Sequence, residues 1–157
     1  MSSFSLPRVA IPASLRLTAG AVQDGEVYLM ERVPQHLGHE TPLDMLNRAE
    51  GFFPFKPKGL NGTVLLVAKA RTVTLVVPRT TAPEDPARLS AARQGRLEIT
   101  LADGSQLRGS VTLELPAYHS RPLDYLNASA QPFFAIQDAE QLFLINRAHV
   151  LYVRPED

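Results

Sequence analysis

Hydrophobic and polar residues alternate in short runs along much of the chain. In the runs at 96–101 (RLEITL) and 106–115 (QLRGSVTLEL), apolar residues occupy nearly every second position. A period of two predicts half-buried β-strands, and Asp103 and Gly104 between the runs are expected to supply the positive φ angles of a tight hairpin. Gly109 predicts a bulge or bend in the second strand. Three further β-rich runs follow, at 133–136, 140–145 and 149–153.

A six-residue phrase occurs twice, as PLDMLN at 42–47 and as PLDYLN at 122–127. Neighbouring segments also match in order: 25–29 with 109–113, 51–55 with 132–136, and 65–78 with 142–155. Ordered matches over such a span predict a tandem duplication of a unit of about 60 to 65 residues. Each unit then contains five strands and one inserted helical turn.

The predicted duplication divides the chain into four parts. They are an N-terminal segment (1–13), a first repeat (14–79), a linker (80–95) and a second repeat (96–157). Around the linker, Asp85, Pro86 and Gly95 punctuate the sequence and predict a helix of about two turns at 86–94. One interpretation is a solvated connector, and the alternative is a basic docking helix that carries Arg88 and Arg93.

The repeated phrase has the composition of a short helix with defined ends. Thr41 is an N-cap residue, Pro42 suits the first helical position, and Asp44 lies in the first turn, where the helix dipole favours a negative charge. Asn47 is placed to adopt the left-handed backbone of a helix C-terminus. The two leucines of each copy are spaced by three and are expected to face one side. The expected core positions are Leu46, Leu126, Phe53, Phe134, Val76 and Val153.

Two interpretations of the phrase remain open. In the first, it forms a small helical plug whose leucines close a barrel, while its Asp and Asn fix the two helix ends. In the second, the repeated polar residues form a recognition surface, made by Asp44, Asn47, Asp124 and Asn127.

The sequences LADGSQLRGSVTLEL and LDYLN, followed by INRAHVLYV, resemble the two motifs of the Sm-like barrel family. The resemblance covers each unit and implies a mainly β fold of two tandem five-stranded SH3-like or Sm-like barrels with short inserted helices, packed with approximate twofold symmetry. It also implies RNA binding as one possible function. The basic-glycine pair of the family's second motif is replaced here by Arg147 and Ala148. The phrase is also similar to one found in bacterial domains, of the form LSDxLN.

Composition narrows the function further. The 157 residues contain sixteen basic and sixteen acidic side chains, so no overall positive field attracts nucleic acid or anionic lipid. Cysteine is absent, which excludes disulfides, thiolate zinc sites and a cysteine nucleophile. Prolines interrupt the N-terminal segment, and no run reaches the roughly 20 apolar residues of a membrane span. A cytoplasmic protein without membrane contact is expected.

Candidate catalytic and metal-binding groups are few. His36 and His39 are three residues apart, but Gly38 favours a loop, and no third metal ligand is adjacent. His119, Ser120 and Asp124 are the residue types of a nucleophile triad, yet neighbouring side chains on an extended segment point apart. No glycine-rich phosphate motif is present. We therefore expect no enzyme activity, no metal and no cofactor.

The remaining expectation is a non-enzymatic bacterial adaptor or regulatory module that binds another protein, as a monomer or homodimer. Segments that differ between the two units are not needed to build either one, so they are the expected contact surfaces. The candidate partner-binding residues are Tyr118, His119 and Arg121, together with Lys56, Lys58 and Asn61 of a loop that the second unit lacks. The alternative is an Sm-like RNA-binding protein.

Overall fold

The computed structural model describes residues 8–30, 40–79, 93–113 and 121–156. The first half of the chain contains β1 (Arg8–Leu17), β2 (Val22–Met30), α1 (Pro42–Asn47), β3 (Phe52–Pro57), β4 (Leu65–Ala68), the 3-10 turn η1 (Lys69–Arg71) and β5 (Thr72–Pro78). The second half contains β6 (Arg93–Leu101), β7 (Gln106–Leu113), α3 (Pro122–Asn127), β8 (Phe133–Gln137), β9 (Gln141–Asn146), the 3-10 turn η4 (Arg147–His149) and β10 (Val150–Glu156). The predicted mainly β class is confirmed.

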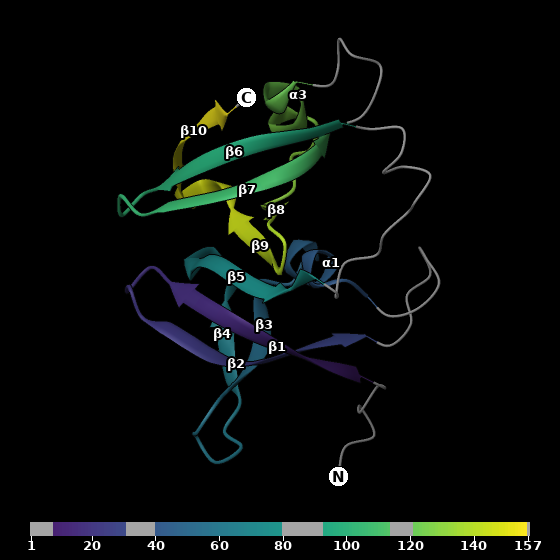
Figure 1. Ribbon diagram of the computed structural model, residues 1–157. Coiled ribbons are helices and arrows are strands. Elements are labelled where there is room, and N and C mark those ends of the chain that lie inside the picture. Colours follow the sequence, from purple (N-terminus) through teal and green to yellow (C-terminus); the bar gives the residue numbers. More distant parts are fainter. Residues whose placement is uncertain (1–7, 31–39, 80–92, 114–120, 157) are drawn as a thin grey trace.

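All ten described strands belong to one antiparallel sheet in the order β10-β6-β7-β8-β9-β5-β1-β2-β3-β4 (Figure 1). The last strand of each half therefore lies beside the first strand of the same half. The described strands do not close either half into a barrel, because β4 pairs only with β3 and β10 only with β6. The expected pair of closed barrels is replaced by one continuous sheet.

The two halves meet where β5 pairs with β9, and we call this pairing the β5–β9 junction. Its register runs from Thr74 opposite Ile145 to Pro78 opposite Gln141. Two equivalent strands would meet across a twofold axis, whereas this junction joins the fifth strand of one half to the fourth strand of the other. The predicted twofold packing was therefore wrong at this contact, which is head to tail.

Each half has its own apolar core, but the two cores exchange residues across the junction. The core beneath the first half includes Phe133, Leu142 and Leu144 from the second half. The core of the second half includes Val73 from β5. Because each core needs side chains from the other half, neither half buries all of its apolar surface alone.

Three of the predicted core positions are buried, namely Leu46, Phe53 and Phe134. Val76, Leu126 and Val153 are only partly buried. Both neighbours of Val76 in β5 are buried, namely Leu75 and Val77. The prediction therefore selected the wrong face of this strand, where several consecutive residues are apolar and alternation gives a weak signal.

Gly25 and Gly109 occupy matching positions in β2 and β7 and allow a neighbouring strand to come close. A Cβ atom at Gly25 would lie 2.3 Å from the carbonyl oxygen of Lys56, and one at Gly109 would lie 2.9 Å from that of Gln137. The bulge predicted at Gly109 is not seen in the pairing of β7 with β6, whose register is continuous, and the close approach of Gln137 is what requires glycine there. In the hairpin before it, Gly104 has φ of 87°, whereas Asp103 accepts a hydrogen bond from the Ser105 N–H instead of adopting a positive φ.

The described part of the linker differs from its prediction. β6 begins at Arg93, so the last two residues of the helix expected at 86–94 are in a strand. The second set of strands thus starts three residues before the predicted boundary at 96. Arg88 and the rest of the proposed helix lie outside the described residues.

Candidate functional site

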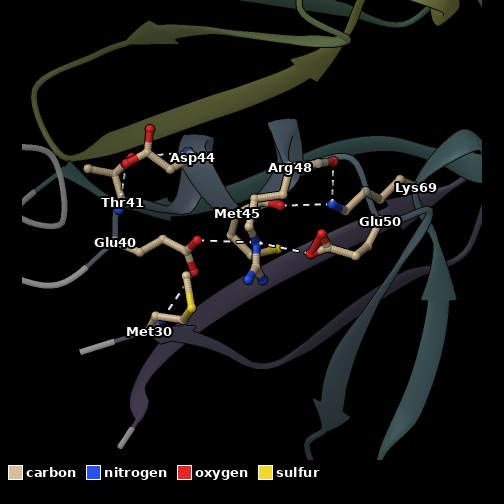
Figure 2. Close-up of polar contacts among 8 residues, drawn as sticks. All are labelled: Met30, Glu40, Thr41, Asp44, Met45, Arg48, Glu50 and Lys69. Carbon is tan, nitrogen blue, oxygen red and sulfur yellow. Dashed lines mark hydrogen bonds and ion pairs between the residues drawn. The ribbon is translucent and has the colours of Figure 1, made fainter. Parts of the chain in front are cut away.

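The first copy of the repeated phrase forms α1, and its polar residues hold the helix N-terminus. The Thr41 hydroxyl accepts a hydrogen bond from the Asp44 N–H at 3.1 Å, and the Asp44 carboxylate accepts one from the Thr41 N–H at 3.1 Å (Figure 2). This reciprocal pair is a capping box, which satisfies two backbone donors. Asp44 therefore has the structural role that the first interpretation assigned to it.

Charged groups surround the C-terminal end of the same helix. The ammonium of Lys69, the residue directly after β4, donates to the carbonyl oxygens of Met45 at 2.8 Å and Arg48 at 3.1 Å. Burial is the main cause of a lowered pKa for Lys69, and the nearby charge of Arg48 lowers this pKa further. Because two helix carbonyls hold the ammonium, we interpret Lys69 as a C-terminal anchor of α1.

Glu40 connects this cluster to the sheet. Its carboxylate, which is almost completely buried, accepts a hydrogen bond from the Met30 N–H at 3.1 Å and pairs with Arg48 at 3.2 Å. Arg48 also lies 3.6 Å from Glu50 at the surface (Figure 2). A buried carboxylate that is paired in this way joins the end of β2, at Met30, to the end of α1, at Arg48. The arrangement is a structural network of charges in which ion pairs hold Arg48, although its buried Nε makes no hydrogen bond within the described residues.

Asn47 has a different role from the one predicted. The positive backbone angle expected of it is not observed, because Asn61 is the one non-glycine residue with a positive φ in the described ranges. The Asn47 amide instead reaches the other half, where it donates to the Phe133 carbonyl at 3.1 Å and accepts from the Phe133 N–H at 2.9 Å. The asparagine that ends the repeated phrase thus forms, at Asn47, a contact between the two halves.

Other polar contacts strengthen this union. Asn146 is buried, and its amide donates to the carbonyl oxygens of Lys69 at 3.3 Å and Thr72 at 3.0 Å. Arg16 of β1 forms an ion pair with Asp103 of the β6–β7 turn. Buried amides that lose such partners are costly, so these contacts select one way of joining the halves.

The second copy of the phrase forms α3 and is less buried than α1. Asp124 accepts hydrogen bonds from the backbone N–H of Arg121 at 3.2 Å and from its guanidinium at 3.1 and 3.2 Å. These bonds raise the pKa of Arg121. Arg121 therefore stands at the N-terminus of the helix with its own ion pair, while Tyr118 and His119 lie outside the described residues. Asn127 is exposed at the other end of α3.

Lys56, predicted in a loop, belongs instead to β3, and Lys58 follows the end of this strand. Both line an open groove of about 740 Å³, which we call the Lys56–Lys58 groove. Its lining residues come from β1, β2, β3, β5 and the loop after β3, together with Glu140 of the β8–β9 turn and Gln141 of β9. Asp24 and Glu26 lie beside the lysines. Three prolines also line the groove, at 12, 57 and 78.

Asn61 does not line this groove. It lies in the loop that Figure 1 shows projecting below β3 and β4, and its φ of 51° identifies a structural reason for asparagine there. Gly59 and Gly62 on either side also have positive φ angles. The loop bends so that the Lys58 N–H donates to the Asp24 carbonyl at 2.8 Å, and this bond fixes Lys58 beside β2.

Several residues that shape these sites were not predicted. Lys69 interrupts an apolar run, LLVAKARTVTLVV, and such an interruption signals a buried or edge charge. Asn146 precedes a 3-10 turn in the corresponding run of the second half, and its counterpart in the first half is Ala68. Glu40 follows the undescribed segment and gives no comparable signal.

Within the described ranges, no group of three or more His, Cys, Asp or Glu side chains is arranged to hold a metal ion. None of the helices described here is long and apolar enough to cross a membrane. Comparison with protein-family models, with curated proteins and with solved structures finds no match for this chain.

Proposed function

We propose that the chain is a non-enzymatic adaptor that binds an extended segment of another protein in the Lys56–Lys58 groove. The observation that carries this proposal is the lining of the groove, where residues of strands, prolines and charges of both signs from the first half lie beside Glu140 and Gln141 of the second. A volume of about 740 Å³ is within the usual range for a ligand site. Extended peptides suit such a surface because sheet grooves supply backbone contacts and pockets for alternate side chains.

The charges favour a protein partner over RNA. Lys56 and Lys58 lie near Asp24, Glu26 and Glu140, so the groove is not uniformly positive. A nucleic-acid channel needs net positive charge to neutralise phosphates, and exposed aromatic rings to stack bases. A peptide with both acidic and basic residues would complement this lining better.

We also propose that the halves are duplicated copies of one SH3-like or Sm-like unit. Each half has the same element order, the same helical phrase and a glycine at the closest strand approach. Each half also shifts its strand register at the same place, between β1 and β5 in the first and between β6 and β10 in the second. The groove arises only after duplication, because it takes residues from both copies.

Selection of peptides from a displayed random library, followed by calorimetric titration, tests the adaptor function without knowledge of the natural partner. Reversing the two groove charges, in the double variant Lys56→Glu/Lys58→Glu, should weaken selected peptides by about tenfold or more. The matched control is Arg71→Glu/Arg96→Glu, which reverses two exposed charges outside the groove and should leave affinity unchanged.

Two results would contradict the proposal. One is a set of selected peptides whose affinity is the same for the groove variant and the control. The other is tight binding of single-stranded RNA that weakens steeply with salt, which would support the RNA-binding alternative instead.

A further inference from the structure

The two ends of the sheet are edge strands, β4 in the first half and β10 in the second, and among the described residues each is paired along one side only. Figure 1 shows β10 in the upper half of the molecule and β4 in the lower half. Each is the counterpart of a strand that is paired at the β5–β9 junction, because β4 corresponds to β9 and β10 corresponds to β5. The junction joins the fifth strand of one half to the fourth strand of the other. The two ends of the sheet therefore offer one further fourth strand, β4, and one further fifth strand, β10, each with an open edge.

Large exposed apolar side chains gather at these two ends. Phe52 of β3 is 63% exposed and Leu66 of β4 is 73% exposed, while Leu151 of β10 is 59% exposed. Tyr152 follows Leu151 and is also exposed. Apolar residues along an unpaired edge are unfavourable in water and favour pairing with another strand.

The same positions are buried where the halves meet. Strand registers make Phe52 equivalent to Phe133, because these residues begin the pairings of β3 with β4 and of β8 with β9. By the same registers Leu66 corresponds to Leu144, which shifts the sequence match of 65–78 with 142–155 by one residue. Phe133 and Leu144 are only 2% and 0% exposed. Both belong to the core of the opposite half.

Leu151 follows the same rule on the other strand. In the pairing of β10 with β6, the register shift leaves Leu151 without an opposite residue. In the pairing of β5 with β1, the same shift leaves Val73 without one, so Leu151 and Val73 are equivalent. Val73 is 8% exposed and packs in the core of the second half, across the junction. The exposed residues at the two edges therefore correspond to the residues that, at the β5–β9 junction, pack in the core of the opposite half.

The repeated phrase supplies an independent observation. Asn47, the last residue of α1, binds both backbone groups of Phe133. Asn127, the last residue of α3, is exposed and makes no side-chain hydrogen bond within the described part of the chain. Asn47 binds Phe133, and the residue equivalent to Phe133 is Phe52. The equivalent partner for Asn127 is therefore the backbone of Phe52, which lies toward the other end of the sheet.

We propose that copies of this chain associate head to tail, with β10 of one copy paired to β4 of the next. By analogy with the β5–β9 junction, Val153 lies opposite Leu66 of the neighbouring copy, and Asn127 binds the backbone of its Phe52. Such a heterologous contact repeats, and it gives a ring if the rotation closes and a linear chain if it does not.

Two substitutions make the contact between copies weaker than the internal one. The N–H of Arg79 donates to the carbonyl oxygen of Glu140. Because the N–H groups of every second residue point to the same neighbouring strand, the N–H of Val77 also points to β9. The counterpart of Val77 is Pro155, which has no N–H. The counterpart of the buried Asn146 is Ala68, which has no amide. The association is therefore concentration-dependent, unlike the fixed junction within the chain.

Sedimentation velocity over a concentration series tests the proposal on the full chain. Leu66→Lys blocks the β4 edge and Leu151→Lys blocks the β10 edge, and both residues are exposed in the single chain, so each variant should fold. Each should weaken self-association by about tenfold or more, as should Asn127→Ala. Val22→Lys places the same charge at an exposed apolar residue of β2 and should associate like the unmodified chain.

Mixing the two edge variants distinguishes head-to-tail pairing from every symmetric dimer. Leu66→Lys keeps an intact β10, and Leu151→Lys keeps an intact β4, so the mixture should form a one-to-one dimer and nothing larger. A symmetric contact between like edges would leave one of the single variants dimeric. The proposal is overturned if the unmodified chain remains monomeric at every concentration, if either edge variant alone self-associates as tightly as the unmodified chain, or if the mixture associates no more tightly than each edge variant alone.

Discussion

Glu98 of β6 illustrates how a single buried carboxylate connects distant strands. It is almost completely buried and accepts a hydrogen bond from Arg108 of β7 at 2.8 Å, while Arg154 of β10 lies 3.3 Å away. The hydrogen bond from Arg108 is the main cause of its lowered pKa; burial opposes this shift and the charge of Arg154 adds to it. The carboxylate therefore stabilises the pairing of β6 with both of its neighbours.

The lowered pKa predicts the sign of a pH dependence. The unfolded value for a glutamate is about 4.3. Because the folded value is lower, the contribution of Glu98 to the free energy of unfolding is complete above about pH 4.3 and is lost as the pH falls through the folded pKa. Glu98→Gln should thus lower stability near neutral pH and make the loss of stability in acid less steep.

Urea unfolding at a series of pH values measures this effect. The control is Glu50→Gln, which removes an exposed carboxylate with a longer ion pair of 3.6 Å to Arg48. An acid dependence that is equally steep in the unmodified chain and in Glu98→Gln would show that Glu98 is not responsible. Asp103 and Asp138 also have pKa values lowered by hydrogen bonds, so some dependence on acid should remain in every variant.

At the scale of single elements, the two copies of the helical phrase differ in burial. Met45 and Leu46 of α1 are buried in the first core, whereas no residue of α3 is fully buried. Leu46→Ala should therefore cost about 2 to 5 kcal/mol, the range for a truncated core leucine. Leu126→Ala should cost less, because Leu126 is only partly buried.

Thermal or urea unfolding of the two variants at low protein concentration compares these costs in one chain. Equal losses would contradict the difference in burial between α1 and α3. If the loss at Leu126 grows when the protein is concentrated, the result would also indicate that α3 becomes more buried in the association proposed above.

The elements themselves could be predicted from sequence because they depend on local patterns. Alternation identified the hairpin of β6 and β7, and the capping pattern of Thr41 and Asp44 identified α1. The error at Val76 arose where several adjacent residues of β5 are apolar. The role of Asn47 could not be predicted, because its partner Phe133 is distant in sequence and their contact depends on which strands meet.

At the scale of the whole molecule, the sequence did not allow us to predict which strands join the two halves. Two five-strand units present four edges, and local patterns do not state which edges pair. The structure selects β5 and β9, and with them the exchange of Phe133 and Val73 between the cores. The Lys56–Lys58 groove has the same origin, so its lining could not be predicted either; its two lysines were selected from the sequence only as part of a loop that the second unit lacks.

Shared cores predict that the two halves unfold together. Removing the Phe133 ring leaves a cavity in the core of the first half although Phe133 belongs to the second, so Phe133→Ala should cost about 3 to 5 kcal/mol and affect both halves. Calorimetry of the unmodified chain, at concentrations too low for association, should show one transition whose calorimetric and van't Hoff enthalpies agree. Hydrogen exchange of Phe133→Ala should become faster in β1 and β5 as well as in β8, while Val22→Ala, an exposed control, should leave exchange in these strands unchanged. Two separate transitions, or faster exchange confined to the second half, would mean that each half is stable by itself and that the β5–β9 junction contributes little to folding.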